Sequence, residues 1–178
     1  MSEIGLLSTV EQIDLIRRKE ITSRELTEHF IDRIERLDIE INSVVTRDFE
    51  TAIEEAALAD QTIRSGDHLG RLHGIPVTIK DALKTKGILS TGGATELRSN
   101  VPDEDAAVVA AIRREGAIVM GKTNLPRWSG DIQAYNDIFG TTKNPWDLSR
   151  GPGGSSGGAA AAVAMGFTSF EIGTDIGG

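Results

Sequence analysis

The sequence predicts an α/β protein in which a mixed β-sheet core is surrounded by helices and preceded by a helical segment. After residue 74, apolar alternating stretches and amphipathic stretches follow one another in the order strand, helix, strand, which is typical of α/β folds. The first 65 residues hold only one of the 20 glycines, Gly5, so this part favours helices over turns. A hydrophobic content of 39% with 26% charged residues indicates a globular chain with a core.

Three amphipathic helices are expected in the first part of the chain. Ser8 followed by Glu11, and Thr22 followed by Glu25, have the spacing of capping boxes, in which side chains satisfy free backbone amides of the first helical turn. After the second box, apolar residues recur on one face at Leu26, Phe30, Ile34 and Leu37. The stretch 49–65 has a similar pattern and predicts the third helix. We expect these helices to act as scaffold.

Strands and helices alternate in the second part. The alternation of Ile75, Val77 and Ile79 predicts a strand that ends at Lys80 and Asp81. The helical spacing of apolar residues predicts a helix over 105–115. The short apolar run that follows predicts a buried parallel strand over 117–120. The alanine-rich run 157–166, with glycine at both ends, predicts a tightly packed helix.

This change in pattern divides the chain into two parts. Residues 1–66 are expected to form the N-terminal helical segment, and residues 67–178 the first part of a single α/β core domain. The last 28 residues carry only two charges, Glu171 and Asp175. A stretch so poor in charge and rich in glycine, serine and alanine is expected to lie in the interior.

Composition excludes several classes of function. Lys and Arg number 19 against 27 Asp and Glu, a net charge of −8, so we expect no direct nucleic-acid partner and no membrane surface. The chain has no cysteine, and its three histidines are scattered, which excludes a thiolate metal site and a cysteine nucleophile and offers no ligand spacing for a metal. The amino terminus lacks a signal-peptide pattern, which makes the cytoplasm the expected compartment. Any catalytic chemistry must then use Ser, Thr or Lys side chains, carboxylates or backbone groups.

The stretch Gly116–Thr123 matches the phosphate-binding loop pattern G-x-x-x-x-G-K-[ST]. That loop requires a strand before its first glycine and flexible residues between the two glycines. Here a charged helical stretch precedes Gly116, and the four residues between the glycines are apolar and strand-like. We therefore interpret this stretch as a buried strand that ends in a glycine turn, not as a nucleotide site.

Two later glycine clusters are more informative. Residues 151–158 combine five glycines with the adjacent Ser155 and Ser156, and 173–178 bring further glycines to the end of the chain. Alone, the first cluster is typical of a flexible loop and the second of a simple turn. The alanine helix after the first cluster follows without a linker and fixes the direction of its hydroxyls. Backbone amides around glycines, as in the second cluster, can form a concave site for an oxyanion.

Five segments follow one another along the chain: Gly74–Asp81 (GIPVTIKD), Gly116–Asn124, Gly140–Asp147 (GTTKNPWD), Gly153–Gly158 (GGSSGG) and Gly173–Gly178 (GTDIGG). In this order they resemble the landmarks of the amidase signature family. The resemblance is weak before Gly74 and strong after it. Several long motifs in the right order are more specific than any single glycine loop. Arg127 departs from the family, which commonly has an acidic residue there.

The resemblance implies a Ser, cis-Ser, Lys triad that hydrolyses carboxamides through an acyl-enzyme. Lys80 would be the base and Ser155 the bridging hydroxyl, with the Gly154–Ser155 peptide bond in the cis form. The oxyanion hole would be formed by Ile176, Gly177 and Gly178. The supporting residues would be Ser156, Thr174 and Asp175. The nucleophilic serine would come directly after Gly178, so we expect a longer enzyme, and expect these 178 residues alone to be inactive.

The implied activity is cleavage of a small-molecule amide to a carboxylate and ammonia or an amine, with no metal and no cofactor. Two alternatives stay open: the amidase (glutaminase) subunit of a tRNA-dependent amidotransferase, and a non-catalytic fragment that binds or assembles. A homodimer is also left open. The mechanism needs Lys80 neutral, and a facing carboxylate would oppose this, so Asp81 is expected to point away from Lys80.

Overall fold

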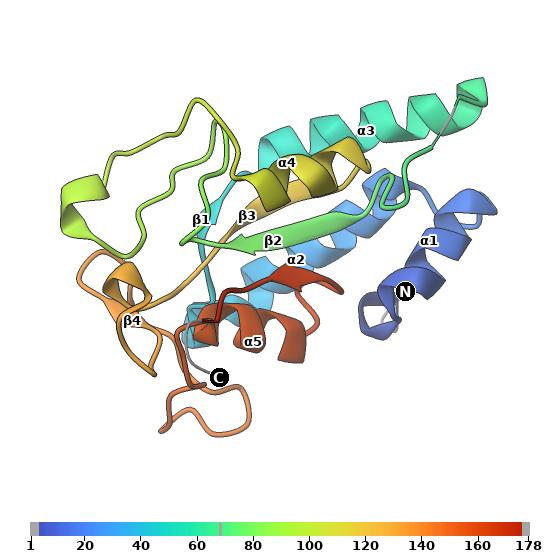
Figure 1. The fold of residues 1–178 in the computed structure, drawn as a ribbon. Coiled ribbons are helices and arrows are strands. Elements are labelled where there is room, and N and C mark those ends of the chain that lie inside the picture. Colours follow the sequence, from blue (N-terminus) through green and yellow to red (C-terminus); the bar gives the residue numbers. More distant parts are fainter. Residues whose placement is uncertain (1–3, 68, 176–178) are drawn as a thin grey trace.

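The computed structural model describes residues 4–67 and 69–175 (Figure 1). The helices are α1 (Thr9–Arg17), α2 (Ser23–Ile41), α3 (Phe49–Ser65), α4 (Ala107–Arg114) and α5 (Gly157–Ala164), with short 3₁₀ turns η1 (Ile4–Leu6), η2 (Thr95–Leu97) and η3 (Arg127–Ser129). The strands are β1 (Val44–Arg47), β2 (Pro76–Lys80), β3 (Ile118–Thr123), β4 (Tyr135–Asn136), β5 (Gly140–Thr141) and β6 (Glu171–Ile172).

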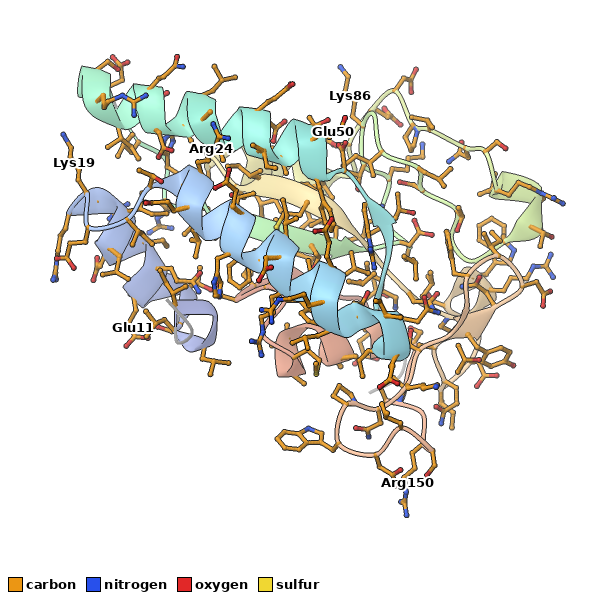
Figure 2. The ribbon with its side chains drawn as sticks, turned by 180° about the vertical axis from the view of Figure 1, so that it is seen from behind. Glu11, Lys19, Arg24, Glu50, Lys86 and Arg150 are labelled. Carbon is orange, nitrogen blue, oxygen red and sulfur yellow. The ribbon has the colours of Figure 1, made fainter. Side chains whose placement is uncertain are left out.

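The core is a four-stranded mixed sheet in the order β1-β3-β2-β6. Strand β2 runs parallel to both β3 and β6, whereas β1 is antiparallel to β3. Strands β4 and β5 form a separate antiparallel ribbon. Figure 1 shows α4 and α5 on the near face of the large sheet, and Figure 2, seen from behind, shows α2 and α3 side by side across the other face. The α/β class and mixed sheet are confirmed.

Local signals predicted the first helices well. Ser8 and Thr22 both form complete capping boxes, with Glu11 and Glu25 respectively. Three of the four residues predicted for the apolar face of α2, Leu26, Phe30 and Ile34, are buried and form a core with residues of β2 and β3. The fourth, Leu37, is exposed. Of the charged side chains labelled in Figure 2, Glu11, Arg24 and Glu50 lie on the outer surface of these helices.

Strand β1 was not expected, because residues 1–66 were predicted to be helical. It is only four residues long, Val44–Arg47, and its pairing with β3 bridges almost 80 residues of sequence, as in Val44 opposite Thr123. The buried Asp38 carboxylate shapes the turn into β1 by accepting bonds from the Ser43 and Val44 amides at 2.8 and 2.9 Å. β1 brings the first segment into the sheet, while the division at residue 66 stays a prediction.

Two further expectations need correction in detail. Strand β3 extends to Thr123, three residues beyond the expected end, because Gly121 and Lys122 continue the ladder with β2. The carboxyl-terminal stretch is only partly interior: α5 buries one face, but Ala160, Val163 and Ala164 are exposed. The charge-poor composition could not predict which face of the helix is covered. None of the helices in the described ranges combines the length and apolar character needed to cross a membrane.

Candidate active site

Lys80 is the last residue of β2, and its side chain is fully buried. β2 lies between β3 and β6, so neighbouring strands cover it on both edges. Side chains alternate along a strand, so Lys80 and Thr78 lie on the same face of the sheet. Thr78 pairs with Glu171 of β6, and its hydroxyl donates a hydrogen bond to the Glu171 carboxyl group. The position of Lys80 therefore follows from its place at the end of a central strand.

Three hydroxyl groups surround the Lys80 amine. Its Nζ lies 2.6 Å from Ser155 Oγ, 3.0 Å from Ser156 Oγ and 2.6 Å from Thr174 Oγ1. The serines and the threonine come from segments 75 to 94 residues away in sequence. The structure thus brings together four residues that the resemblance implied: Lys80, Ser155, Ser156 and Thr174.

The two serines are placed by the turn that precedes α5. The Gly154–Ser155 peptide bond is cis, as the resemblance implied. Gly158, in the first turn of α5, packs against the chain after β3, and its amide donates to Asn124 O at 3.1 Å. A Cβ on Gly158 would lie 2.3 Å from Asn124 N, so only glycine fits here without a shift of the backbone. This contact fixes the start of α5 against the sheet.

Ser156 links this turn to the last described segment. Its Oγ donates to Thr174 O at 3.0 Å and accepts from the Thr174 amide at 3.1 Å. A Cβ on Gly173 would meet Ser156 Oγ at 2.8 Å, so a side chain here would displace the Ser156 hydroxyl. Ser156 therefore holds Thr174 beside Lys80, while the supporting role expected for both residues stays a prediction.

Burial dominates the electrostatics of Lys80. Removal from water disfavours the ammonium form and lowers the pKa of Lys80, while the charge of Asp175 acts in the opposite direction. The neighbouring Asp81 carboxylate instead accepts bonds from Thr91 and lies 3.7 Å from Lys122 Nζ. The prediction that Asp81 points away from Lys80 is confirmed.

Sequence reasoning missed a buried carboxyl group beside β2. Glu171 accepts bonds from the hydroxyls of Thr78 and Thr123, the latter at 2.9 Å. Burial raises the pKa of Glu171 to about 7, although both hydroxyl bonds and Lys122 oppose the rise. The sequence offered one signal, a lone acidic residue in the charge-poor carboxyl-terminal stretch.

A cavity of about 300 Å³ opens next to Asp81, the residue after Lys80. Its apolar lining includes Leu97, Leu125 and Trp128, and its polar lining includes Ser90 and Asn100. The structure thus provides a partly apolar space at the same end of the sheet as the Lys80 amine.

The arrangement can move a proton between a serine hydroxyl and a buried amine. Within residues 4–67 and 69–175, no group of three or more metal-ligating side chains lies close enough to hold an ion. Ile176, Gly177 and Gly178 lie outside the described residues, so their oxyanion-hole role stays a prediction. The same holds for the serine expected to follow them.

Comparisons with known proteins place the chain among relatives of one kind. A model of the protein family described as Amidase matches residues 25–178. A glutamyl-tRNA(Gln) amidotransferase subunit from Moraxella catarrhalis is 44% identical over 178 residues, which is 100% of this chain and 36% of that protein. The chain therefore spans about a third of the length of this relative.

Solved structures of amidases share the fold. A bacterial aryl acylamidase of the amidase signature enzymes superposes with a TM-score of 0.83 and 36% identity, over 91% of this chain and 34% of that chain. The peptide amidase of Stenotrophomonas maltophilia superposes with a TM-score of 0.86 and 33% identity, over 90% and 34% respectively. The likeness thus extends from the sequence motifs to the arrangement of helices and strands.

Proposed function

Since this chain belongs to the Amidase family, we propose that the protein hydrolyses the carbon–nitrogen bond of a non-peptide carboxamide to a carboxylate and ammonia or an amine. The observation that carries the proposal is the 2.6 Å contact between the buried Lys80 Nζ and Ser155 Oγ. A buried amine beside a hydroxyl is a base and relay suited to activating a serine. The cytoplasm as compartment and a small-molecule amide as substrate are parts of the same proposal.

The proposed reaction begins at the serine expected directly after Gly178. Its hydroxyl proton passes to Ser155 Oγ while the Ser155 proton passes to neutral Lys80, and the serine oxygen forms a bond with the amide carbon. The amides of Ile176, Gly177 and Gly178 would stabilise the resulting oxyanion. As the carbon–nitrogen bond breaks, the proton returns through Ser155 to the leaving nitrogen. Water then attacks the acyl ester by the same route, which releases the carboxylate and restores the serine.

Lys80 can act as a base only if its amine is neutral. An ordinary lysine has a pKa of about 10.4, so work near pH 7 needs a depression of roughly 3 units, on the order of 4 kcal/mol. Burial lowers the pKa of Lys80 in the required direction. The hydroxyls of Ser155, Ser156 and Thr174 hydrogen-bond the amine without adding a negative charge.

A second candidate is the amidase subunit of a tRNA-dependent amidotransferase. It is favoured by the 44% identity, over the whole chain, to the glutamyl-tRNA(Gln) amidotransferase protein of Moraxella catarrhalis. In that case the same site would release ammonia from glutamine for use by partner subunits. The chemistry at Lys80 and Ser155 would be unchanged, so only the substrate and partners distinguish the two candidates.

Ammonia release by the full-length protein tests both candidates. The protein is incubated with a panel of aliphatic and aromatic primary amides and with glutamine, in the presence and absence of the other amidotransferase subunits. Hydrolysis of simple amides without partners supports the first candidate, and glutamine hydrolysis that needs partners and charged tRNA supports the second. No ammonia from any substrate, together with no reaction with a serine-directed probe, would support the non-catalytic alternative.

A further inference from the structure

A second lysine, Lys122, is fully buried next to the candidate site. It lies in β3 opposite Ile79 of β2, whereas Lys80 lies opposite Thr123. Because side chains alternate along paired strands, Lys122 leaves the sheet on the face opposite Lys80. Full burial of a lysine is rare unless the amine has partners, so its contacts indicate what it does.

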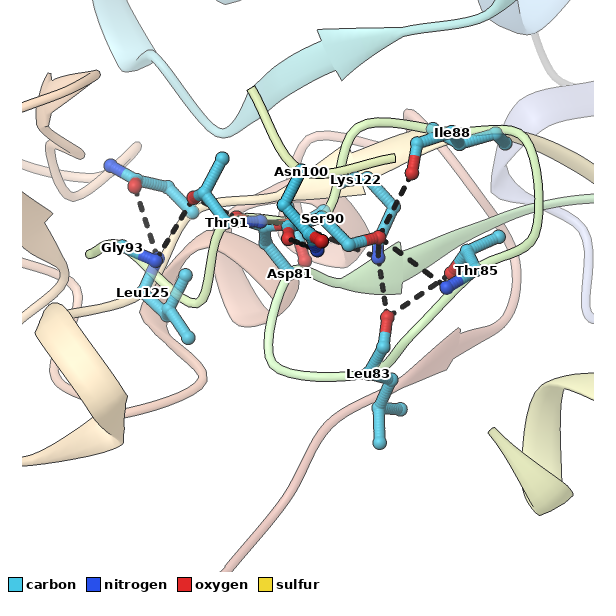
Figure 3. Close-up of polar contacts among 12 residues, drawn as sticks. Asp81, Leu83, Thr85, Ile88, Ser90, Thr91, Gly93, Asn100, Lys122 and Leu125 are labelled. Atoms are coloured by element: carbon cyan, nitrogen blue, oxygen red, sulfur yellow. Dashed lines mark hydrogen bonds and ion pairs between the residues drawn. The ribbon is translucent and has the colours of Figure 1, made fainter. Parts of the chain in front are cut away.

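Lys122 holds the segment that follows β2 (Figure 3). Its Nζ donates to Leu83 O at 2.6 Å and to Ser90 Oγ at 2.9 Å, and it lies 3.7 Å from Asp81 Oδ1. Both side chains of the Lys122–Asp81 pair are fully inaccessible to solvent. Such a pair persists only where further hydrogen bonds satisfy both groups.

Asp81 is held by a second set of bonds from the same segment. The Thr91 amide donates to Asp81 Oδ1 at 3.0 Å, and Thr91 Oγ1 donates to Asp81 Oδ2 at 2.5 Å. The Gly92 amide donates to the Asp81 carbonyl at 3.1 Å. The Asp81 carboxylate is therefore held by Thr91 and lies beside Lys122, on the side of β2 away from the Lys80 amine.

The sequence places a carboxylate directly after the lysine that must be neutral. An opposite charge within about 4–6 Å typically shifts a pKa by 1 to 3 units toward the charged form. In the structure the charge that acts on Lys80 is that of Asp175. Without Lys122 on its far side, an Asp81 carboxylate free to turn toward Lys80 would favour the Lys80 ammonium, which cannot accept a proton. A cation on the far side of Asp81 removes this conflict without removing the carboxylate that organises the segment.

We propose that Lys122 is a positioning residue for the lysine base: it compensates Asp81 and holds that carboxylate on the far side of β2, leaving Lys80 to contact hydroxyls. This inference rests on the proposed function, because it gives Lys122 a role through Lys80. It adds to the triad a second buried lysine, whose amine contacts Leu83, Ser90 and Asp81. The match to a phosphate-loop pattern at Gly116–Thr123 then reflects a buried lysine of β3 that acts on Asp81.

Other charged groups act on the two lysines and must be held constant in the test. Glu171 on β6 and Asp105 before α4 act on Lys122 together with Asp81, and Asp175 acts on Lys80. The test therefore alters only Asp81 and Lys122. Lys122→Met removes the cation, Lys122→Gln removes it but keeps a donor, and the double variant Asp81→Asn/Lys122→Met removes both charges.

The direct readout is the titration of Lys80 in the full-length protein with ¹³C-labelled lysine, followed by NMR of its Cε and assigned with Lys80→Met. We expect Lys122→Met and Lys122→Gln to raise the midpoint of Lys80 by about one unit or more, and the double variant to restore it. Correspondingly, kcat/KM at pH 7 falls about tenfold in the single variants, recovers above pH 9, and is restored in the double variant. KM changes little throughout.

A purely structural role gives a different result. An unchanged Lys80 midpoint in folded single variants, or a loss of activity that is the same at every pH, would overturn the proposal. Failure of both single variants to fold, judged by circular dichroism, would also count against it, because Lys122 would then serve the fold alone. Failure of the proposed function gives a different result: the wild-type protein then cleaves no amide. The titration of Lys80 can still be measured in that case, so the two failures are distinguished.

Discussion

Lys80 and Ser155 are 75 residues apart in the sequence, yet Lys80 Nζ lies 2.6 Å from Ser155 Oγ. The contact joins the end of a central strand to the turn before α5. Neither segment carries the chemistry alone, because a buried lysine without hydroxyl partners has nothing to relay its proton. The proposed function depends on this contact.

Replacing Lys80 by Met should remove the base while keeping an apolar side chain of similar length. We expect kcat/KM for amide hydrolysis to fall by about 10³-fold, since a general base contributes roughly 10² to 10⁴. Thermal stability should stay the same or rise, because a buried amine is lost. Lys86→Met, at an exposed lysine in the following loop, is the matched control and should leave both unchanged.

Replacing Ser155 by Ala should interrupt the relay. The Lys80 amine keeps Ser156 and Thr174 as partners, so the fold should be retained while kcat falls by about 10²-fold or more. Ser149→Ala changes an exposed serine of the same loop and should keep wild-type kcat. Equal effects of the two substitutions would contradict the assigned role of Ser155.

Glu171 should make stability fall as the pH rises toward neutrality. The pKa of Glu171 is raised from 4.5 to about 7 in the folded chain, so the folded state holds a proton that the unfolded state releases. Its favourable contribution is fully present below pH 4.5 and is lost as the pH passes 7. Glu171→Gln should therefore raise the free energy of unfolding at pH 8 by on the order of 2 kcal/mol, measured by urea denaturation.

The control for this pH dependence is Glu54→Gln, at an exposed position on α3. It should leave the slope of stability against pH unchanged. A Glu171→Gln protein that follows the wild-type slope between pH 5 and 8 would mean that Glu171 is ionised throughout, against the effect of its burial.

Gly158→Ala should disturb the site through the backbone. The added Cβ would lie 2.3 Å from Asn124 N, and a backbone atom cannot move aside cheaply. We expect a loss of stability of about 2 kcal/mol or more and a fall in kcat, because the turn that carries Ser155 shifts with the start of α5. Ala160→Gly, on the exposed side of the same helix, should cost only about 1 kcal/mol and leave kcat unchanged.

Sequence reasoning succeeded where the signal was local. The capping boxes at Ser8 and Thr22 and the alternation before Lys80 involve neighbours within a few residues, and the structure has helices and a strand there. β1 was missed because four residues carry little periodicity and its partner β3 is remote. The α/β class was predicted from the order of strands and helices after residue 74, so missing β1 did not change it.

The candidate site was predicted through motifs rather than through geometry. Lys80, Ser155 and Thr174 come together as the resemblance implied. The direction of Asp81 followed from charge alone, but its partner Lys122 did not, because the pairing depends on the register of β2 and β3. Glu171 escaped notice because its burial depends on β6, a strand of two residues.

The central claim is that Lys80, through Ser155, activates a serine that follows Gly178. The most direct measurement is the reaction of the full-length protein with a fluorophosphonate, with the modified residue located by peptide mass spectrometry and the rate followed against pH. We predict an adduct on the serine directly after Gly178, formed at least about 100-fold more slowly in Lys80→Met and in Ser155→Ala. An adduct on another residue, or an unchanged rate in both variants, would contradict the claim.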